Sequence, residues 1–130
     1  MAEEKKYKVI IVDDDKFLLD MYAMKFEKVN VEVIALENGE DLLNKLKQGL
    51  RGDLLLLDII MPGMDGLTAL EQIKKENLLK NMKVIMLTNQ GDPEEVKKAK
   101  NMEIDGYMIK AITTPSEVVA KVMAILRSNV

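Results

Sequence analysis

Residues 53–66 read Asp-Leu-Leu-Leu-Leu-Asp-Ile-Ile-Met-Pro-Gly-Met-Asp-Gly, which is the strongest structural signal in the chain. The four consecutive leucines are typical of a strand that is covered on both faces, as in a parallel sheet between two layers of helices. Asp58 follows the last leucine, and Pro62-Gly63 then breaks the chain into a loop. The stretch therefore predicts a buried strand that ends with a carboxylate at the rim of a sheet.

Three further apolar runs also end on polar residues that can contact a phosphoryl group or a divalent cation. These runs and the residues that follow them are Val9–Val12 before Asp13-Asp14-Asp15, Val84–Leu87 before Thr88, and Tyr107–Ile109 before Lys110. A single acid after a strand is usually a turn residue or a helix cap, and we expect Asp15 to have one of these two roles. Four such strand ends in one chain indicate a shared site.

Composition bounds the possible functions. The chain has 130 residues, a size typical of one domain with its own core. The net charge of −3 gives no reason to expect binding to nucleic acid or to an anionic membrane. No cysteine or histidine is present, so thiol and imidazole chemistry are excluded. The charged start of the chain is no signal peptide, and no run approaches the roughly 20 apolar residues of a membrane span, so we expect a cytoplasmic protein.

Short apolar runs alternate with helical patterns along the whole chain, which is typical of βαβ units and a parallel sheet. We expect one α/β domain over residues 1–130, a doubly wound five-stranded parallel sheet of order 2-1-3-4-5 with a flavodoxin-like fold. The less apolar strand at Glu32–Leu36 is expected near an edge. The other strands are expected at Lys8–Val12, Asp53–Leu57, Lys83–Leu87 and Gly106–Ile109.

Several helices carry recognisable start signals. Thr114-Pro115-Ser116-Glu117 combines a capping threonine, a proline at the first helical position and a glutamate that completes a capping box. Asp92-Pro93 and Asn38-Gly39 predict two more helix starts. The last helix is expected to face the sheet through a stripe of apolar residues at helical spacing: Val118, Val119, Val122, Met123, Ile125 and Leu126.

The predicted topology brings distant acids together. In a sheet of this order the functional crevice lies at the carboxyl ends of the first and third strands, so Asp13 and Asp14 become neighbours of Asp58. Two carboxylates 4 Å apart repel each other by about 4 kcal/mol at an effective dielectric constant near 20. Oxygen ligands without histidine or cysteine favour Mg²⁺ as the balancing cation. An aspartate can also act as a nucleophile and form an aspartyl phosphate, with Lys110 as a countercharge and the Thr88 hydroxyl as a donor.

This set of motifs resembles the receiver domain of bacterial response regulators, the CheY-like phospho-accepting part of two-component systems. The resemblance implies that Asp58 accepts phosphate from the phosphohistidine of a sensor histidine kinase or a phosphotransfer protein. It also implies that Asp14, Asp58 and the backbone carbonyl of Ile60 hold Mg²⁺, and that Asp13 assists through water. The matching segments are Val12–Asp15, Asp53–Asp58 with Met61–Gly66, Val84–Thr88 and Asp105–Lys110.

The resemblance also implies a switch. Thr88 and Lys110 would contact the phosphoryl group, and a shift of the Thr88 hydroxyl would be coupled to the rotamer of Tyr107. That movement would remodel the surface made by the fourth helix, the fifth strand and the fifth helix, where a downstream protein binds. Such a domain catalyses only its own phosphorylation and dephosphorylation. Ile60 and Gln90 occupy positions that tune hydrolysis, and because the Ile60 side chain cannot align a water by hydrogen bonding, we expect a long-lived aspartyl phosphate.

The sequence departs from the family pattern at two positions. Ala111 follows Lys110 where the family usually has a proline after a cis peptide bond, and a cis bond to alanine costs about 2.5–4 kcal/mol. Either this bond is trans and the lysine is presented differently, or the site tolerates strain. Asn89 replaces a residue that is usually small, so it either narrows access to Asp58 or offers an amide to the phosphoryl group.

Other functions compete with this interpretation. A pseudo-receiver or scaffold would keep the fold and bind partners without phosphorylation. A phosphatase-like hydrolase would use Asp13 and Asp15 as an Asp-x-Asp pair, but it would leave Asp58 without a purpose. A nucleotide-binding domain lacks its Gly-rich turn here, because three acids follow the first strand. Within the receiver hypothesis, a diffusible effector and a phosphorelay intermediate both remain open.

Overall fold

The computed structural model describes residues 6–88 and 93–128. Its five parallel strands lie in the order β2-β1-β3-β4-β5, so the predicted doubly wound α/β topology is confirmed. The strands are β1 (Lys8–Val12), β2 (Glu32–Leu36), β3 (Leu54–Asp58), β4 (Lys83–Thr88) and β5 (Gly106–Ile109). The helices are α1 (Lys16–Glu27), α2 (Gly39–Lys47), α3 (Gly66–Lys75), α4 (Pro93–Asn101), the short 3₁₀ helix η1 (Lys110–Ile112) and α5 (Pro115–Arg127).

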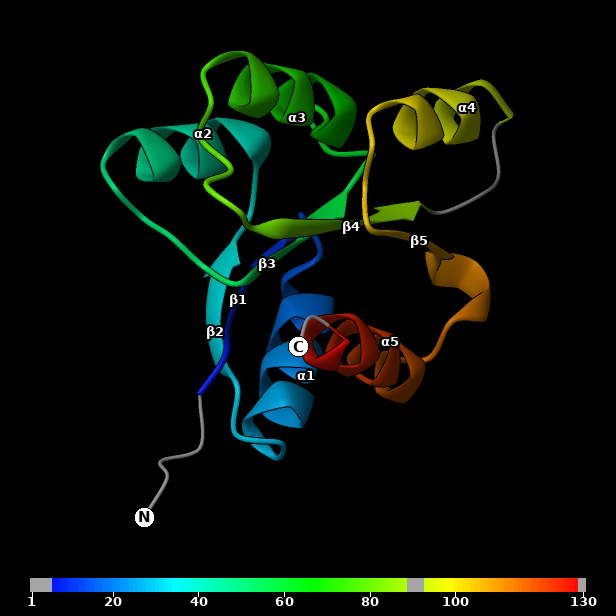
Figure 1. Cartoon of the computed structure of the whole chain (residues 1–130). Coiled ribbons are helices and arrows are strands. Elements are labelled where there is room, and N and C mark those ends of the chain that lie inside the picture. The colour runs from blue at the N-terminus through cyan, green and yellow to red at the C-terminus, as the bar shows by residue number, and fades with distance from the viewer. Residues whose placement is uncertain (1–5, 89–92, 129–130) are drawn as a thin grey trace.

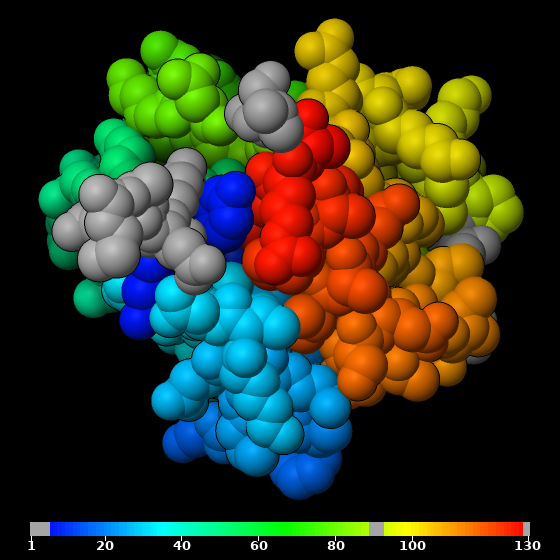
Figure 2. All heavy atoms as spheres, turned by 60° about the horizontal axis from the view of Figure 1, so that its bottom comes forward, coloured from blue at the N-terminus to red at the C-terminus, as the bar shows by residue number. Residues whose placement is uncertain are grey.

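Helices cover both faces of the sheet. α2, α3 and α4 lie on one face, and α1 and α5 lie on the other (Figure 1). α5, in orange and red, packs beside α1 in the space-filling view (Figure 2). Each face has its own apolar core. None of the helices in the described ranges has the length and apolarity that a bilayer crossing requires.

The leucine run explains why the sheet has two cores. Leu55 and Leu57 of β3 belong to the core under α2 and α3, whereas Leu54 and Leu56 belong to the core under α1 and α5. All four side chains are fully buried. β2 lies at the edge, as its weaker apolar pattern predicts, and it buries only Leu36. The absence of polar alternation in β3 therefore follows from burial on both faces.

The helix starts follow the predicted signals where the structure describes them. The Thr114 side chain accepts a hydrogen bond from the Glu117 amide, and the Glu117 carboxylate accepts one from the Thr114 amide, which completes the capping box. Asn38 accepts from the Asp41 amide at 2.8 Å. Asp15 is the cap of α1, one of its two expected roles. α4 begins at Pro93, and the predicted cap Asp92 lies outside the described residues.

The apolar stripe of α5 faces the sheet. Val118, Val119, Val122, Met123 and Leu126 are buried, whereas Ile125 is only half-buried at the border of the same core. This amphipathic pattern fixes the rotation of α5 about its axis, because its opposite side carries the exposed polar residues.

Candidate functional site

The predicted cluster of acids is present at the carboxyl ends of β1 and β3. These two strands are paired, with Val12 in register with Leu57, so the residues that follow each strand meet at one edge of the sheet. Carboxylate oxygens of Asp13, Asp14 and Asp58 all lie within 4.8 Å of one another. Asp13 and Asp58 are buried, whereas Asp14 is exposed and gives the cluster an open side.

Lys110 supplies the positive charge of the cluster. Its ammonium lies 2.8 Å from Asp13 Oδ2 and 3.1 Å from Asp58 Oδ2, and its side chain is only 9% exposed. Burial on its own lowers the pKa of Lys110, but hydrogen bonding to Asp13 and attraction to Asp58 outweigh burial and raise the pKa above its usual value. Lys110 therefore stays charged at neutral pH. One ammonium offsets only part of the charge of three carboxylates.

The surroundings of Asp58 shift the pKa of its carboxyl group. Burial raises the pKa of Asp58 from 3.8 to about 6, Lys110 opposes the rise, and Asp13 adds to it. Asp58 Oδ1 is a buried oxygen without a hydrogen-bond partner, although Oδ2 contacts Lys110. Three carboxylates with an unpartnered buried oxygen, in a chain without cysteine or histidine, fit a hard divalent cation such as Mg²⁺. The residues present thus match the acidic triad typical of a Mg²⁺ site.

The loop after β3 is held in place by Asp65 and Gly66. The Asp65 side chain caps α3 by accepting a hydrogen bond from the Thr68 amide at 2.8 Å. The Gly66 amide donates to the Ile59 carbonyl at 2.7 Å. A Cβ atom at Gly66 would lie 2.2 Å from the carbonyl oxygen of Asp58, so only glycine fits this position. The Asp65-Gly66 pair therefore joins the start of α3 directly to the Asp58 backbone.

Two acids of the matched motifs lie away from this edge. Asp53 Oδ2 accepts a hydrogen bond from the Lys8 amide at the amino end of β1, and Asp105 Oδ2 accepts one from the Val84 amide at the amino end of β4, both at 2.8 Å. These bonds satisfy backbone donors where strands begin. Asp53 and Asp105 thus have a structural role at the opposite edge of the sheet.

The remaining predicted site residues are positioned by β4, β5 and the loops. Thr88 is fully buried at the end of β4, one residue beyond Leu87, which is in register with Asp58. Tyr107 is half-buried on β5 and packs against the core under α2 and α3. Ile60 follows β3 with 48% of its surface exposed. Gln90, together with Asn89, lies outside the described residues.

The conformation of the peptide bond after Lys110 determines how the lysine is presented. No peptide bond within the described ranges is cis, so the Lys110–Ala111 bond is trans. η1 begins at Lys110, and the Thr113 hydroxyl donates to the Ile109 carbonyl at 2.7 Å across this turn. The trans geometry nevertheless brings the Lys110 ammonium to both buried aspartates.

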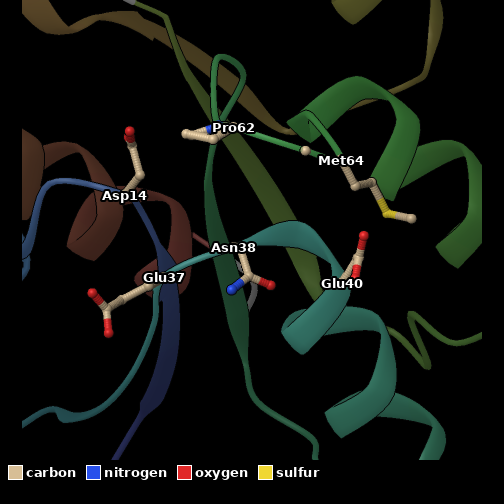
Figure 3. A pocket seen from close by; sticks show the side chains of 7 residues that line it. Asp14, Glu37, Asn38, Glu40, Pro62 and Met64 are labelled. Carbon is tan, nitrogen blue, oxygen red and sulfur yellow. The ribbon is translucent and has the colours of Figure 1, made fainter.

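Asp14 lines two cavities. The first, of about 500 Å³, is shown in Figure 3, where Asp14 extends from the loop after β1 and Pro62 and Met64 come from the loop after β3; Glu37, Asn38 and Glu40 add further polar groups. The second, of about 360 Å³, lies beside Lys110 and Tyr22. Asp14, the exposed acid of the cluster, therefore faces two solvent-filled cavities.

Tyr22 is a neighbour of the site that sequence reasoning missed. It is a buried residue of α1, and burial, followed by the negative charge of Asp13, raises the pKa of its hydroxyl. The signal that points to it is helical spacing, because Tyr22 lies seven residues after the cap Asp15 and thus on the same face of α1.

Comparison with known proteins identifies the family. The family model described as "Response regulator receiver domain" matches residues 9–123. The chain belongs to the response regulator receiver domain family. Receiver domains take phosphate from histidine kinases and are signalling domains rather than classical enzymes.

Several relatives support this membership. The chain is 35% identical over 131 residues to the transcriptional regulatory protein ResD of Bacillus subtilis, an alignment that covers 98% of this chain and 51% of ResD. The chain thus spans about half the length of this curated relative. Among solved structures, a CheY-like receiver from Methanospirillum hungatei has a TM-score of 0.84 at 28% identity, covering 95% of this chain and 96% of that one. The BeF3-activated DrrB receiver domain has a TM-score of 0.79 at 28% identity, covering 95% and 99%.

Proposed function

We propose that residues 1–130 act as a receiver domain in which Asp58 accepts a phosphoryl group from the phosphohistidine of a sensor histidine kinase or a phosphotransfer protein. The observation that carries this proposal is the convergence of Asp13, Asp14 and Lys110 on the buried carboxylate of Asp58. Membership in the receiver family supports the same chemistry. We further propose that the protein works in the cytoplasm.

The transfer itself is a nucleophilic displacement at phosphorus. A carboxylate oxygen of Asp58 attacks the phosphorus atom, the phosphorus–nitrogen bond to the donor imidazole breaks, and an acyl phosphate forms on Asp58. Because the pKa of Asp58 is about 6, Asp58 is an ionised, nucleophilic carboxylate in most of the molecules at pH 7. Lys110, which already contacts Asp58 Oδ2, supplies a countercharge to the incoming phosphoryl oxygens, and the Thr88 hydroxyl donates a hydrogen bond to one of them.

The acids around Asp58 would hold Mg²⁺. Asp14, Asp58 and the backbone carbonyl of Ile60 are the proposed direct ligands, and Asp13 acts through water. When bound, the ion would neutralise negative charge on the transferring phosphoryl group. The unpartnered Oδ1 of Asp58 and the exposed Asp14 support this assignment, because both offer oxygen to a ligand that arrives from solvent.

Phosphorylation would then change the surface of α4, β5 and α5. Thr88 and Tyr107 lie on adjacent strands, with Thr88 in register with Ile109, two residues after Tyr107. A shift of the Thr88 hydroxyl toward the phosphoryl group would favour another rotamer of Tyr107 and alter the surface that a downstream protein binds. No nucleic acid or membrane takes part in this proposal.

Intact-mass measurement tests the proposal. The chain is incubated with acetyl phosphate, with and without Mg²⁺. We expect a gain of one phosphate in the wild type that requires the metal and is absent from Asp58→Asn. Asp20→Asn, which removes an exposed acid of α1, is the matched control and should behave like the wild type. A wild-type chain that gains no phosphate would instead favour the pseudo-receiver or scaffold that binds partners without phosphorylation.

A further inference from the structure

α4 buries the fewest residues of all the α-helices in the described part of the chain. Of its nine residues only Ala99 is buried, whereas α3 buries five residues, including Leu70 and Ile73. Burial of apolar side chains is the main force that fixes a surface helix. The position of α4 must therefore depend on contacts beyond its buried face.

A lysine of α3 makes such a contact at the carboxyl end of α4. The ammonium of Lys74 donates to the backbone carbonyl of Met102 and, at 3.4 Å, to that of Glu103. These carbonyls belong to the turn that ends α4, where Met102 donates its amide to Ala99 and Glu103 donates to Lys100. Glu103 has a φ of 57°, the left-handed conformation typical of the residue that terminates a helix.

The chemistry of this contact favours a specific role. A cation at the carboxyl end of a helix complements the partial negative charge of the carbonyls there. Lys74 is half-buried, and within residues 6–88 and 93–128 no carboxylate lies at ion-pair distance from its ammonium. Its charge is thus directed at the α4 turn. The next residue, Lys75, lies in the same last turn of α3 but is exposed.

The other end of α3 is joined to the phosphoacceptor. The Gly66 amide bonds to Ile59, and the Gly66 Cα leaves no space for a side chain against the Asp58 carbonyl. α3 has ten residues, so it spans roughly 15 Å between these two attachments. A displacement of the loop after Asp58 therefore moves a rigid helix whose far end holds the α4 turn.

We infer that Lys74 is a positioning residue that fixes the carboxyl end of α4 to α3 and thereby couples α4 to the Asp58 loop through α3. The attachment of α4 is argued from the hydrogen bonds of Lys74 to Met102 and Glu103 in the unphosphorylated chain. The coupling rests on the proposed function, because it requires a phosphoryl group or its mimic on Asp58.

Amide hydrogen exchange followed by mass spectrometry tests the attachment. Lys74→Met keeps the aliphatic stem but removes the charge, and we expect exchange in peptides from residues 99–106 to rise roughly tenfold, with no change in β1 or α1. Lys75→Met is the matched control and should exchange like the wild type. Lys74→Arg keeps a cation and should restore protection. If Lys74→Met proves unstable, Lys74→Gln serves as the second neutral variant. Exchange in the neutral variants within twofold of Lys75→Met would overturn the inference.

Beryllofluoride with Mg²⁺ tests the coupling. In the wild type we expect this phosphoryl mimic to change exchange across residues 99–106, and in Lys74→Met we expect at least half of that change to be lost. An equal response in both proteins would overturn the coupling. The attachment of α4 by Lys74 would then still be decided by hydrogen exchange without the mimic. A wild type that does not respond to the mimic anywhere would count against the proposed function instead, so the two failures are distinguishable.

Discussion

At the scale of single residues, the burial of Asp58 sets the behaviour of the site. A buried carboxylate loses its hydration, and one contact to Lys110 does not fully replace it, so the pKa rises to about 6. In the folded chain Asp58 therefore stays protonated up to a higher pH than it does in the unfolded chain. Ionisation of Asp58 at neutral pH costs stability until a cation binds.

The sign of this linkage gives a prediction for Asp58→Asn. Because the folded pKa exceeds the unfolded value of 3.8, stability from protonated Asp58 is fully present below pH 3.8 and is lost as the pH rises through 6. An amide never ionises, so the stability of Asp58→Asn should not fall with this titration. The difference in unfolding free energy, Asp58→Asn minus wild type, should therefore be about 1–3 kcal/mol larger at pH 7 than at pH 3.5. Urea unfolding without divalent cations measures it. A mutant-to-wild-type difference that is the same at both pH values would contradict the buried, perturbed carboxylate.

Ile60 bears on the lifetime of the phosphorylated state. It is 48% exposed beside Asp58, and its side chain has no group that orients a water for attack on the acyl phosphate. We expect a long-lived aspartyl phosphate in the wild type and faster loss in Ile60→Asn, whose amide can hold a water. Decay is followed by intact mass after the phosphodonor is removed. Rapid wild-type decay that Ile60→Asn leaves unchanged would refute this role.

At the scale of secondary-structure elements, the close approach of α3 to β3 makes Gly66 a sensitive position. The alanine methyl of Gly66→Ala would lie 2.2 Å from the Asp58 carbonyl oxygen, so the backbone must shift. We expect a loss of about 1–3 kcal/mol in unfolding free energy together with slower phosphorylation, since Asp58 moves with the strand end.

Thr68→Ala is a suitable control for Gly66→Ala. It changes an exposed residue of the same helix and leaves the backbone amide that Asp65 caps. Urea unfolding and the rate of phosphate gain are measured for both variants. Normal stability and a normal rate in Gly66→Ala would show that the contact between α3 and β3 is looser than described.

Elements were predictable where a local physical signal exists. The leucine run predicts β3 because burial on both faces removes polar alternation, and Thr114 predicts the start of α5 because its capping box is complete in the sequence. The convergence of Asp13 with Asp58 was also predictable, since the expected strand order 2-1-3-4-5 places β1 beside β3. The contact from Lys74 to the α4 turn was not, because a lysine on a helix gives no sign of its distant partner.

The conformation of the peptide bond after Lys110 and the surroundings of Tyr22 could not be predicted from the sequence. The trans bond after Lys110 was one of two alternatives, and only the structure decides between them. Tyr22 was missed because an aromatic residue in α1 indicates core packing, and its helical spacing from Asp15 shows a shared helix face but no contact with Asp13.

At the scale of the whole molecule, the fold concentrates negative charge at one edge of the sheet. Parallel strands all end at the same edge, so acids from β1 and β3 must share it, and Lys110 balances only part of their charge. Binding of a cation to the folded chain then stabilises the entire domain, because the unfolded chain has no such cluster.

Because the cation binds only the folded chain, the melting temperature should depend on the Mg²⁺ concentration. At a concentration 100-fold above its dissociation constant, Mg²⁺ should add about 2.7 kcal/mol to the free energy of unfolding of the wild type. Asp14→Asn should lose most of this gain, whereas Asp20→Asn should keep it. Calorimetry or circular dichroism at several Mg²⁺ concentrations measures the shift. Equal stabilisation of both variants would mean that the ion binds elsewhere.

The most direct test is to locate the phosphoryl group on the chain. The protein is treated with acetyl phosphate and Mg²⁺, digested, and the modified residue is identified by tandem mass spectrometry. We expect a single modified residue, Asp58, with Asp13 and Asp14 unmodified. Phosphate on another residue, or none in a chain that demonstrably binds Mg²⁺, would contradict it.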